Sequence, residues 1–310
     1  MKIVRFNATS EPIARARTGI LLAGDIVGDL RAAYASYLVE EAKDVQGREL
    51  AALRIPPDVR QILHVGPPAR QALEHAAAWL AAALRKDAGS KSIDGEPLFF
   101  PLADARLHNP LKPGRLIIVT GNRGRGNGTP VAANRAPASV MGPVRDLPLA
   151  TSGDDLAYGT GLAIVIASNC HAIAPQDVPS AIAGYMAAND VHPASDSADL
   201  DGDAGFRRCI IGPSLVDARD FPDVAALKLV TRLNGKVVQS GTLAPLRWPL
   251  AELVSRLSRN GLEAGDVIVT GLLSDDAPAG SAAVPYLRNG DVLESEVEGI
   301  GTMRNRVVAA

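Results

Sequence analysis

The chain has 310 residues, of which 47% are hydrophobic and 21% are charged, and its formal net charge is -2. A nearly neutral chain lacks the surplus of Lys and Arg with which nucleic-acid-binding proteins displace counterions, so we expect no nucleic-acid partner. No apolar run approaches the roughly 20 residues that cross a bilayer, and the first residues lack the apolar region of a signal peptide, so we expect no membrane partner.

The composition favours strands and turns. The 29 glycines and 22 prolines indicate many turns between short strands, while aromatic residues make up only 4% of the chain. We therefore predict an α+β fold that is mostly β, with a core of Ala, Val, Leu and Ile. The two cysteines, Cys170 and Cys209, have no metal-type spacing and are too few for a disulfide framework, so we predict a cytoplasmic location.

Helical patterns dominate the first hundred residues. Apolar residues repeat at helical spacing over 29–43 and again over 67–86, whereas segment 87–94 has no such period and is interpreted as a linker or a mobile loop. We predict a variable N-terminal α/β domain over residues 1–100 and a second domain over residues 101–310.

Beyond residue 116 the chain alternates short apolar runs with turn signals. The clearest strands, rich in Val and Ile, are predicted at 116–120, 161–167, 226–233, 267–270 and 292–297. Asn234-Gly235 predicts a tight hairpin turn after the third of these strands. Two helices are predicted, one over 249–259 and one from Pro179 to the polar residues 188–192.

A glycine-rich segment, 121–128, directly follows the first of these strands and carries Arg123 and Arg125. It matches neither the P-loop nor the dinucleotide-binding pattern. We interpret it as a cationic loop beside a pocket, where the two arginines meet a carboxylate ligand. The alternative interpretation is a phosphate cradle made of backbone N–H groups.

Among the five histidines, His192 is the best placed for chemistry, because it closes the polar run 188–192 together with Asn189 and Asp190. The alternative is that Asn189 and Asp190 are simply helix-end and turn formers. No histidine has another His or Cys four residues along, so there is no zinc-type motif. The pair Asp154-Asp155 is interpreted as a solvated turn, with cation binding as the alternative.

The C-terminal half contains several linked motifs in order. They are Gly212-Pro213, Asn234-Gly235-Lys236-Val237-Val238-Gln239, Gly261-Leu262-Glu263-Ala264-Gly265-Asp266, Leu287-Arg288-Asn289-Gly290-Asp291-Val292 and Val297-Glu298-Gly299-Ile300-Gly301-Thr302. With upstream segments, the likeness covers residues 105–308, and the series resembles the fumarylacetoacetate hydrolase family. The resemblance implies a mixed β-roll of sheets around a central pocket, preceded by a smaller N-terminal domain and assembled as a homodimer.

Members of that family typically use Mg²⁺ or Mn²⁺ to polarise a 2-oxo or enol carboxylate, and the resemblance implies three carboxylate ligands. Two of them stand in a Tyr-Glu-x-Glu-Leu strand, where this chain reads Tyr158-Gly159-Thr160-Gly161-Leu162. Asp190 matches the third ligand, so Gly159, Gly161 and Asp190 form a degenerate metal site. Because glycine has no side chain, we expect a larger and less acidic pocket there.

The acid–base positions of the family also depart. After Thr120 the family has Asn-Tyr and then a His and a Glu, whereas here Asn122 is followed by Arg123 and glycines. The family's lysine before the Gly-Pro turn is absent, and Asp203 is the residue nearest to its place. Together these changes imply that the parental mechanism is gone.

We therefore predict a protein of this family that uses no metal and no cofactor and binds or transforms a small anionic, 2-oxo or enol carboxylate-like molecule. Asp190 and His192 are the predicted catalytic residues. The predicted substrate-binding residues are Arg123, Arg125, Asn189, Thr270 and Gly271.

Two alternatives remain open. One is a non-catalytic partner subunit that forms a heteromer with an active paralogue. The other is a metal-dependent hydrolase, decarboxylase or isomerase that uses Asp154, Asp155 or Asp203 as substitute ligands.

Overall fold

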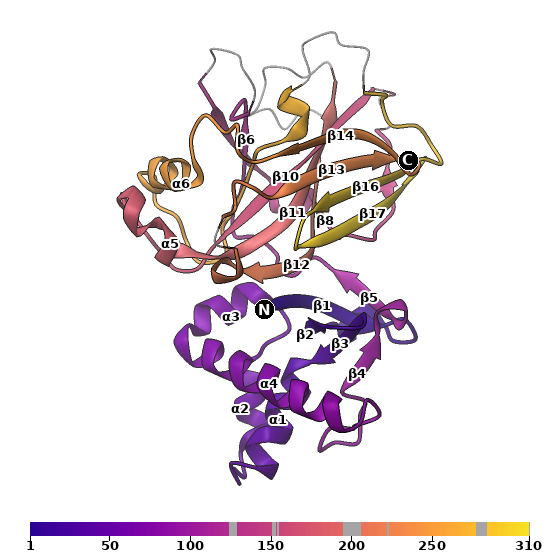
Figure 1. Ribbon diagram of the computed structural model, residues 1–310, viewed down its shortest axis with the longest axis vertical. Helices are drawn as coiled ribbons and strands as arrows, with labels where there is room; N and C mark the ends of the chain where they lie inside the picture. Colours follow the sequence, from indigo (N-terminus) through magenta and orange to yellow (C-terminus); the bar gives the residue numbers. More distant parts are fainter. Residues whose placement is uncertain are drawn as a thin grey trace. The chain divides into compact units, whose positions relative to one another are not determined.

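The computed structural model describes residues 1–123, 129–150, 153, 155–194, 206–221, 223–276 and 284–309. The chain divides into two compact units, Met1–Lys112 and Pro113–Ala310 (Figure 1). Strand β4 (Phe99–Pro101) pairs with β3 (Ile26–Asp29), and β5 (Ala105–His108) pairs with β1 (Lys2–Ala8), so the first unit extends beyond residue 100. Segment 87–94 lies inside this unit, where Ile93 N donates to Ser36 Oγ at 3.0 Å, rather than linking two domains.

The first unit is an antiparallel sheet with helices packed on it. Its strands are β1 (Lys2–Ala8), β2 (Arg17–Leu22), β3 (Ile26–Asp29), β4 (Phe99–Pro101) and β5 (Ala105–His108). Its helices are α1 (Leu30–Glu40), α2 (Gly47–Arg54), α3 (Val59–Val65), α4 (Pro67–Lys86) and the short η1 (Ile13–Arg15) and η2 (Leu102–Asp104). The strand order is β4-β3-β2-β1-β5.

Local sequence explains the helices of this unit. The side chain of Asp29 accepts a hydrogen bond from Ala32 N at 3.0 Å and so caps the start of α1. Pro67 opens α4, and its buried residues include Leu73, Ala76 and Leu80 at three- and four-residue steps. Gly28 on β3 allows close approach, because a Cβ there would lie 2.9 Å from the Leu80 side chain.

The second unit contains two sheets, and these are the elements that position the candidate site. Its strands are β6 (Leu116–Thr120), β7 (Val131–Arg135), β8 (Val140–Met141), β9 (Leu147–Pro148), β10 (Leu156–Ile166), β11 (Ile182–Pro193), β12 (Arg208–Asp217), β13 (Lys228–Leu233), β14 (Lys236–Thr242), β15 (Val267–Thr270), β16 (Val292–Val297) and β17 (Gly301–Val308). Its helices are α5 (Val178–Ala181), α6 (Leu250–Ser258), η3 (Pro137–Ser139), η4 (Pro175–Asp177), η5 (Ala218–Asp220) and η6 (Leu273–Asp276).

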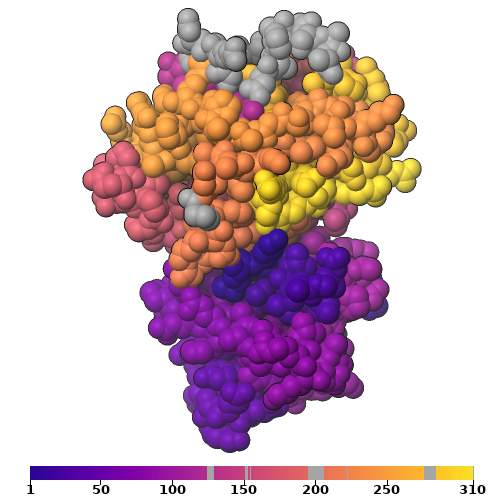
Figure 2. Space-filling view, in the orientation of Figure 1, coloured from indigo at the N-terminus to yellow at the C-terminus, as the bar shows by residue number. Residues whose placement is uncertain are grey.

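The inner sheet has the order β12-β11-β10-β15-β6-β7, with β8 beside β12, and the outer sheet has the order β14-β13-β16-β17-β9. The face of the second unit shown in Figure 2 is formed largely by outer-sheet strands, coloured orange and yellow. Most pairs are antiparallel, but β15 with β6, β12 with β8 and β17 with β9 are parallel. The prediction of a mixed, mostly β fold is confirmed.

One predicted helix is wrong. After four helical residues in α5, the segment from Ile182 to Pro193 forms strand β11. β11 pairs along its length with both β10 and β12, and these ladder hydrogen bonds override the local helical pattern. Asp190 and His192 therefore lie within a strand and not at the end of a helix.

An ion pair between half-exposed Arg115 and buried Asp266 fastens the start of β6 to the start of β15. Asp266 is 1% exposed and accepts hydrogen bonds from Arg115 N at 3.0 Å, Arg115 Nε at 3.0 Å, Arg115 Nη2 at 2.5 Å and Glu263 N at 2.9 Å. Arg115 Nη2 also donates to the carbonyl of Gly261 at 2.7 Å. Hydrogen bonding to Asp266 raises the pKa of Arg115, so the guanidinium stays charged.

Replacing Asp266 by Ala should therefore lower the free energy of unfolding by about 2–4 kcal/mol, because the change leaves Arg115 and two backbone N–H groups without their acceptor. Urea denaturation followed by circular dichroism measures the loss. Glu252→Ala is the matched control, since Glu252 pairs with Arg256 at the surface and its removal should cost about 0.5 kcal/mol or less. Equal losses in the two variants would contradict the role given to Asp266.

Candidate functional site

The pairing of β10 with β11 decides which side chains share a face of the inner sheet. Gly159 lies opposite Asp190, and Ala157 lies opposite His192. Opposite residues in an antiparallel pair project to the same side, and so do residues two apart on one strand. One face of the inner sheet therefore carries Gly159, Gly161, Asp190 and His192. Gly159, Gly161 and Asp190 thus lie on the same side, as expected for the degenerate metal site.

The other face of the same strands carries a buried polar layer against the outer sheet. Asn189 accepts a hydrogen bond from Gly159 N at 3.1 Å and donates to Ser295 Oγ at 2.7 Å. The hydroxyls of Thr160 and Thr231 lie 2.8 Å apart. Asn189 is fully buried, so the structure places this predicted substrate-binding residue between the sheets, where both ends of its amide are used.

The volume beside the two glycines is filled by the turn that follows β15. A Cβ at Gly159 would lie 2.8 Å from both Cβ and the backbone N of Ser274. A Cβ at Gly161 would lie 2.7 Å from the Thr270 carbonyl oxygen and 3.0 Å from the Leu272 side chain. The expectation of extra open volume at Gly159 and Gly161 is therefore wrong, because the residues around η6 occupy that space.

Asp190 and His192 lie side by side on β11. His192 Nδ1 is 3.4 Å from Asp190 Oδ2, which is within ion-pair distance but lacks hydrogen-bond geometry. The Asp190 side chain is 3% exposed, and the His192 side chain is 21% exposed. The structure thus brings the two predicted catalytic residues together, with the imidazole as the more accessible group.

A further residue of this face was not predicted as part of it. Cys209 on β12 lies opposite Asp190 in the ladder and is buried. Burial, together with the nearby Asp190 carboxylate, raises the pKa of the Cys209 thiol well above its usual value. The thiol is therefore neutral at physiological pH, and Asp190 lies between a glycine and a thiol.

Asn122 and Thr270 form a second buried cluster. Asn122 Nδ2 donates to Thr270 Oγ1 at 2.9 Å and to the Trp248 carbonyl at 3.2 Å, while Asn122 Oδ1 accepts from Trp248 N at 2.9 Å. Gly271 has a φ of 69°, and a Cβ there would lie 2.5 Å from the Leu243 side chain. Thr270 and Gly271 thus hold the turn that leads into η6, in contact with protein groups.

Arg123 lies near the same turn. It is 4% exposed, and its Nη1 donates to the carbonyl of Thr242 on β14. A Cβ at Gly241 would lie 3.2 Å from Arg123 Cζ and 3.1 Å from the Leu273 side chain, so the guanidinium and the turn meet at β14. Arg125 lies outside the described residues.

The proposed substitute metal ligands are only partly described. Asp154 and Asp203 lie outside the described residues. Asp155 pairs with Arg288 Nη1 at 2.8 Å in an ion pair whose side chains are 47% and 67% exposed. Across the described ranges, which omit 124–128, 151–152, 154, 195–205, 222, 277–283 and 310, no group of three or more His, Cys, Asp or Glu side chains is arranged to hold a metal ion.

Ser274 and Cys209 were not predicted as part of the site, because only the folded chain places Ser274 beside Gly159 and Cys209 opposite Asp190. Ser274 is 115 positions from Gly159 along the chain, and it reaches the glycine because β15 pairs with β10 and the chain then turns back at Gly271. Apart from Gly271, whose φ is 69°, the sequence around this turn gives no local signal for the contact. In the part of the chain that the structure describes, no helix is long and apolar enough to cross a bilayer.

Gly159→Ala should destabilise the second unit by about 1–3 kcal/mol, because the added methyl group would overlap Ser274 and its backbone nitrogen. Thermal unfolding of the purified variant measures the effect. Ser274→Gly in the same chain should recover only part of the loss, since the nitrogen of residue 274 remains 2.8 Å from the new methyl group.

Gly89→Ala serves as the control, because Gly89 lies in an exposed turn and the nearest atom to a Cβ there is a carboxylate oxygen of Asp87 at 3.3 Å. Its unfolding temperature should stay close to that of the parent chain. If Gly159→Ala unfolded at the same temperature as the control, the space beside Gly159 would be open after all.

Comparison with known proteins gives a consistent assignment. The sequence model of the family described as fumarylacetoacetate (FAA) hydrolase C-terminal matches residues 121–308. Oxaloacetate tautomerase YisK of Bacillus subtilis (strain 168) is 29% identical over 232 residues, which are 67% of this chain and 75% of that protein. An uncharacterized protein of Archaeoglobus fulgidus is 33% identical over 239 residues, which are 71% of this chain and 91% of that protein.

Solved structures agree with the sequence matches. Fumarylacetoacetate hydrolase from psychrophilic Exiguobacterium antarcticum has a TM-score of 0.71 at 25% identity, with 100% of both chains covered. Maleylpyruvate hydrolase from Sphingobium sp. SYK-6 has a TM-score of 0.69 at 21% identity over the same share of both chains, which bears on the fold alone. Because the family match spans more than half of the sequence, the chain belongs to the fumarylacetoacetate hydrolase family.

Proposed function

We propose that this protein binds and transforms a small anionic 2-oxo or enol carboxylate without a divalent metal ion, and that it has lost metal-dependent cleavage of C–C bonds. The observation that carries the proposal is the pair Gly159 and Gly161. They stand where the family resemblance places two carboxylate ligands, and Ser274 and Leu272 fill the space beside them.

The residues that share the face with these glycines do not fit Mg²⁺ or Mn²⁺. Mg²⁺ demands six oxygen ligands in near-ideal octahedral geometry, and carboxylates supply most of the protein's share of charge. In the row across β10, β11 and β12, Gly159 offers no side chain, Asp190 offers one carboxylate and Cys209 offers a buried thiol. A thiol suits softer metals, so this donor set supports chemistry without a hard divalent ion.

Proton transfer is the chemistry that these side chains support best. In a keto–enol tautomerisation, a base removes a proton from the carbon beside the carbonyl and a proton is delivered to the carbonyl oxygen, so no atom is gained or lost. His192 is the exposed member of the pair, and Asp190 faces its Nδ1, which leaves Nε2 to exchange the proton with the substrate. That a relative 29% identical to this chain is named an oxaloacetate tautomerase supports this reaction class.

The absence of a metal requirement has a direct readout. After purification without chelator, elemental analysis should find no stoichiometric Mg or Mn. Added Mg²⁺ or Mn²⁺ at about 5 mM should leave the unfolding temperature unchanged relative to NaCl of equal ionic strength, because only an ion that binds the folded state raises it. A retained ion, or a saturating rise in unfolding temperature, would overturn this part of the proposal.

The acid–base role is tested with oxaloacetate, whose enol form absorbs in the ultraviolet. In buffer that contains EDTA, His192→Gln and Asp190→Asn should each slow the approach to keto–enol equilibrium by about 100-fold or more, because each removes part of the proton-transfer pair. His171→Gln is the matched control, since His171 is exposed and lies outside this face. Rates equal to those of the parent chain in the first two variants would rule out the assignment.

A further inference from the structure

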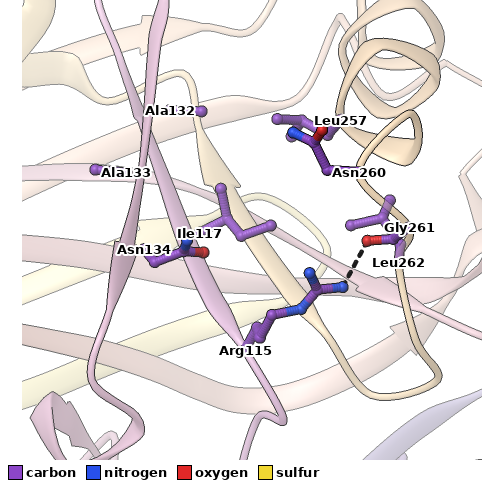
Figure 3. A pocket seen from close by; sticks show the side chains of 9 residues that line it. All are labelled: Arg115, Ile117, Ala132, Ala133, Asn134, Leu257, Asn260, Gly261 and Leu262. Atoms are coloured by element: carbon purple, nitrogen blue, oxygen red, sulfur yellow. Dashed lines mark hydrogen bonds between the residues drawn. The ribbon is translucent and has the colours of Figure 1, made fainter. Parts of the chain in front are cut away.

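A small hollow opens at the other end of the inner sheet, between the β6–β7 pair and the end of α6 (Figure 3). Its volume is about 110 Å³, several times the roughly 30 Å³ share of a water molecule in the liquid and well below the roughly 300 Å³ of a pocket for a drug-sized ligand. The wall is apolar where Ile117, Leu257 and Leu262 line it. Such a hollow takes a ligand of only a few non-hydrogen atoms.

This hollow is separate from the face that carries Asp190. Ile166 N donates to the Asp266 carbonyl, so the Arg115–Asp266 pair lies level with the end of β10. Gly159 lies seven residues further along β10, which corresponds to roughly 23 Å at 3.3 Å per residue. A ligand in the hollow therefore does not contact Asp190 or His192.

Arg115 supplies a fixed cation to the hollow. A guanidinium has five N–H donors, and three are used here, by Nε and Nη2 with Asp266 and by Nη2 with the Gly261 carbonyl. Within the described residues, the two N–H groups of Nη1 have no partner. Because three hydrogen bonds hold the guanidinium in place, a ligand that binds to Nη1 does not have to immobilise this side chain.

Two amides stand around the same hollow. Asn134 and Asn260 line it together with Arg115, as Figure 3 shows, and neither side-chain amide has a protein partner among the residues that the structure describes. Gly261 has a φ of 73°, so the chain leaves the helical direction of α6 just after Asn260, and this sets the position of Asn260. The same turn directs the Gly261 carbonyl toward Arg115. Arg115 and the two exposed asparagines, each with spare donors, thus stand at the rim of a small hollow with an apolar wall.

We propose that this hollow is a binding site for a small monocarboxylate of about three or four carbons. The carboxylate accepts from Arg115 Nη1 and from the Asn134 and Asn260 amides, and its short apolar part lies against Ile117 and Leu257. Asp266 already neutralises the Arg115 charge, so the affinity is in the millimolar range, the level at which a site senses an abundant metabolite. This inference is independent of the function proposed above.

The test uses sodium pyruvate as the probe and the intact protein. Amide resonances in a ¹H–¹⁵N spectrum should shift in a saturable way around Arg115, Asn134 and Asn260, and NaCl or pyruvamide at matched concentration should not reproduce the shifts. Asn260→Asp keeps the shape of the side chain and adds a negative charge at the rim, so it should weaken binding roughly five- to tenfold. Asn289→Asp, outside the lining, makes the same change in net charge and should bind pyruvate as the parent does.

Three results would overturn the proposal. They are the lack of a saturable shift up to about 50 mM pyruvate, an unchanged affinity in Asn260→Asp, and shifts that gather around Asp190 and His192 instead. The last result would assign pyruvate to the Asp190 face and would leave the function proposed there standing. Conversely, unchanged rates of oxaloacetate tautomerisation in His192→Gln and Asp190→Asn would contradict the function proposed above. That result would not affect the binding site proposed for the hollow.

Discussion

The register between β10 and β11 is the constraint on which the second unit depends. A slip of β11 by one residue against β10 would turn Asp190 and His192 toward the outer sheet and would turn Asn189 to the opposite face. The polar layer specifies the register, because Asn189 accepts from Gly159 N and donates to Ser295 on the outer sheet. These bonds form only when Asn189 faces inward, and Asp190 is then held on the opposite face as a nearly buried carboxylate.

The glycines of β10 and the turn after β15 depend on each other. Ser274 and Leu272 lie against the strand itself, where a Cβ at Gly159 or Gly161 would meet them. The hydrogen bonds of Asn122 with Thr270 and Trp248 hold the same turn from its other side. The two glycines and the position of the turn therefore depend on each other, because a side chain at either glycine would overlap the residues of the turn.

The Arg115–Asp266 pair connects the fold to the hollow beside it. Asp266 holds the first residues of β6 and β15 in parallel register, and the same bonds orient the guanidinium so that Nη1 is left over. Only Asp266 of this pair is buried, so loss of its partners would leave an uncompensated buried charge, and this keeps the local geometry fixed. The site proposed there thus uses a group whose position is already set by folding.

Local sequence determined much of this protein. Runs of Val and Ile predicted β6, β15 and β16 with their observed bounds, and Asn234-Gly235 predicted its hairpin, where both residues have positive φ. Motif order pointed to the family and to Gly159, Gly161 and Asp190 as one group. Only the tertiary structure decided that β11 is a strand, that Asn189 faces the outer sheet and that Ser274 fills the space beside Gly159. Long-range ladder pairing and packing set these positions, and neither leaves a local signal in the sequence.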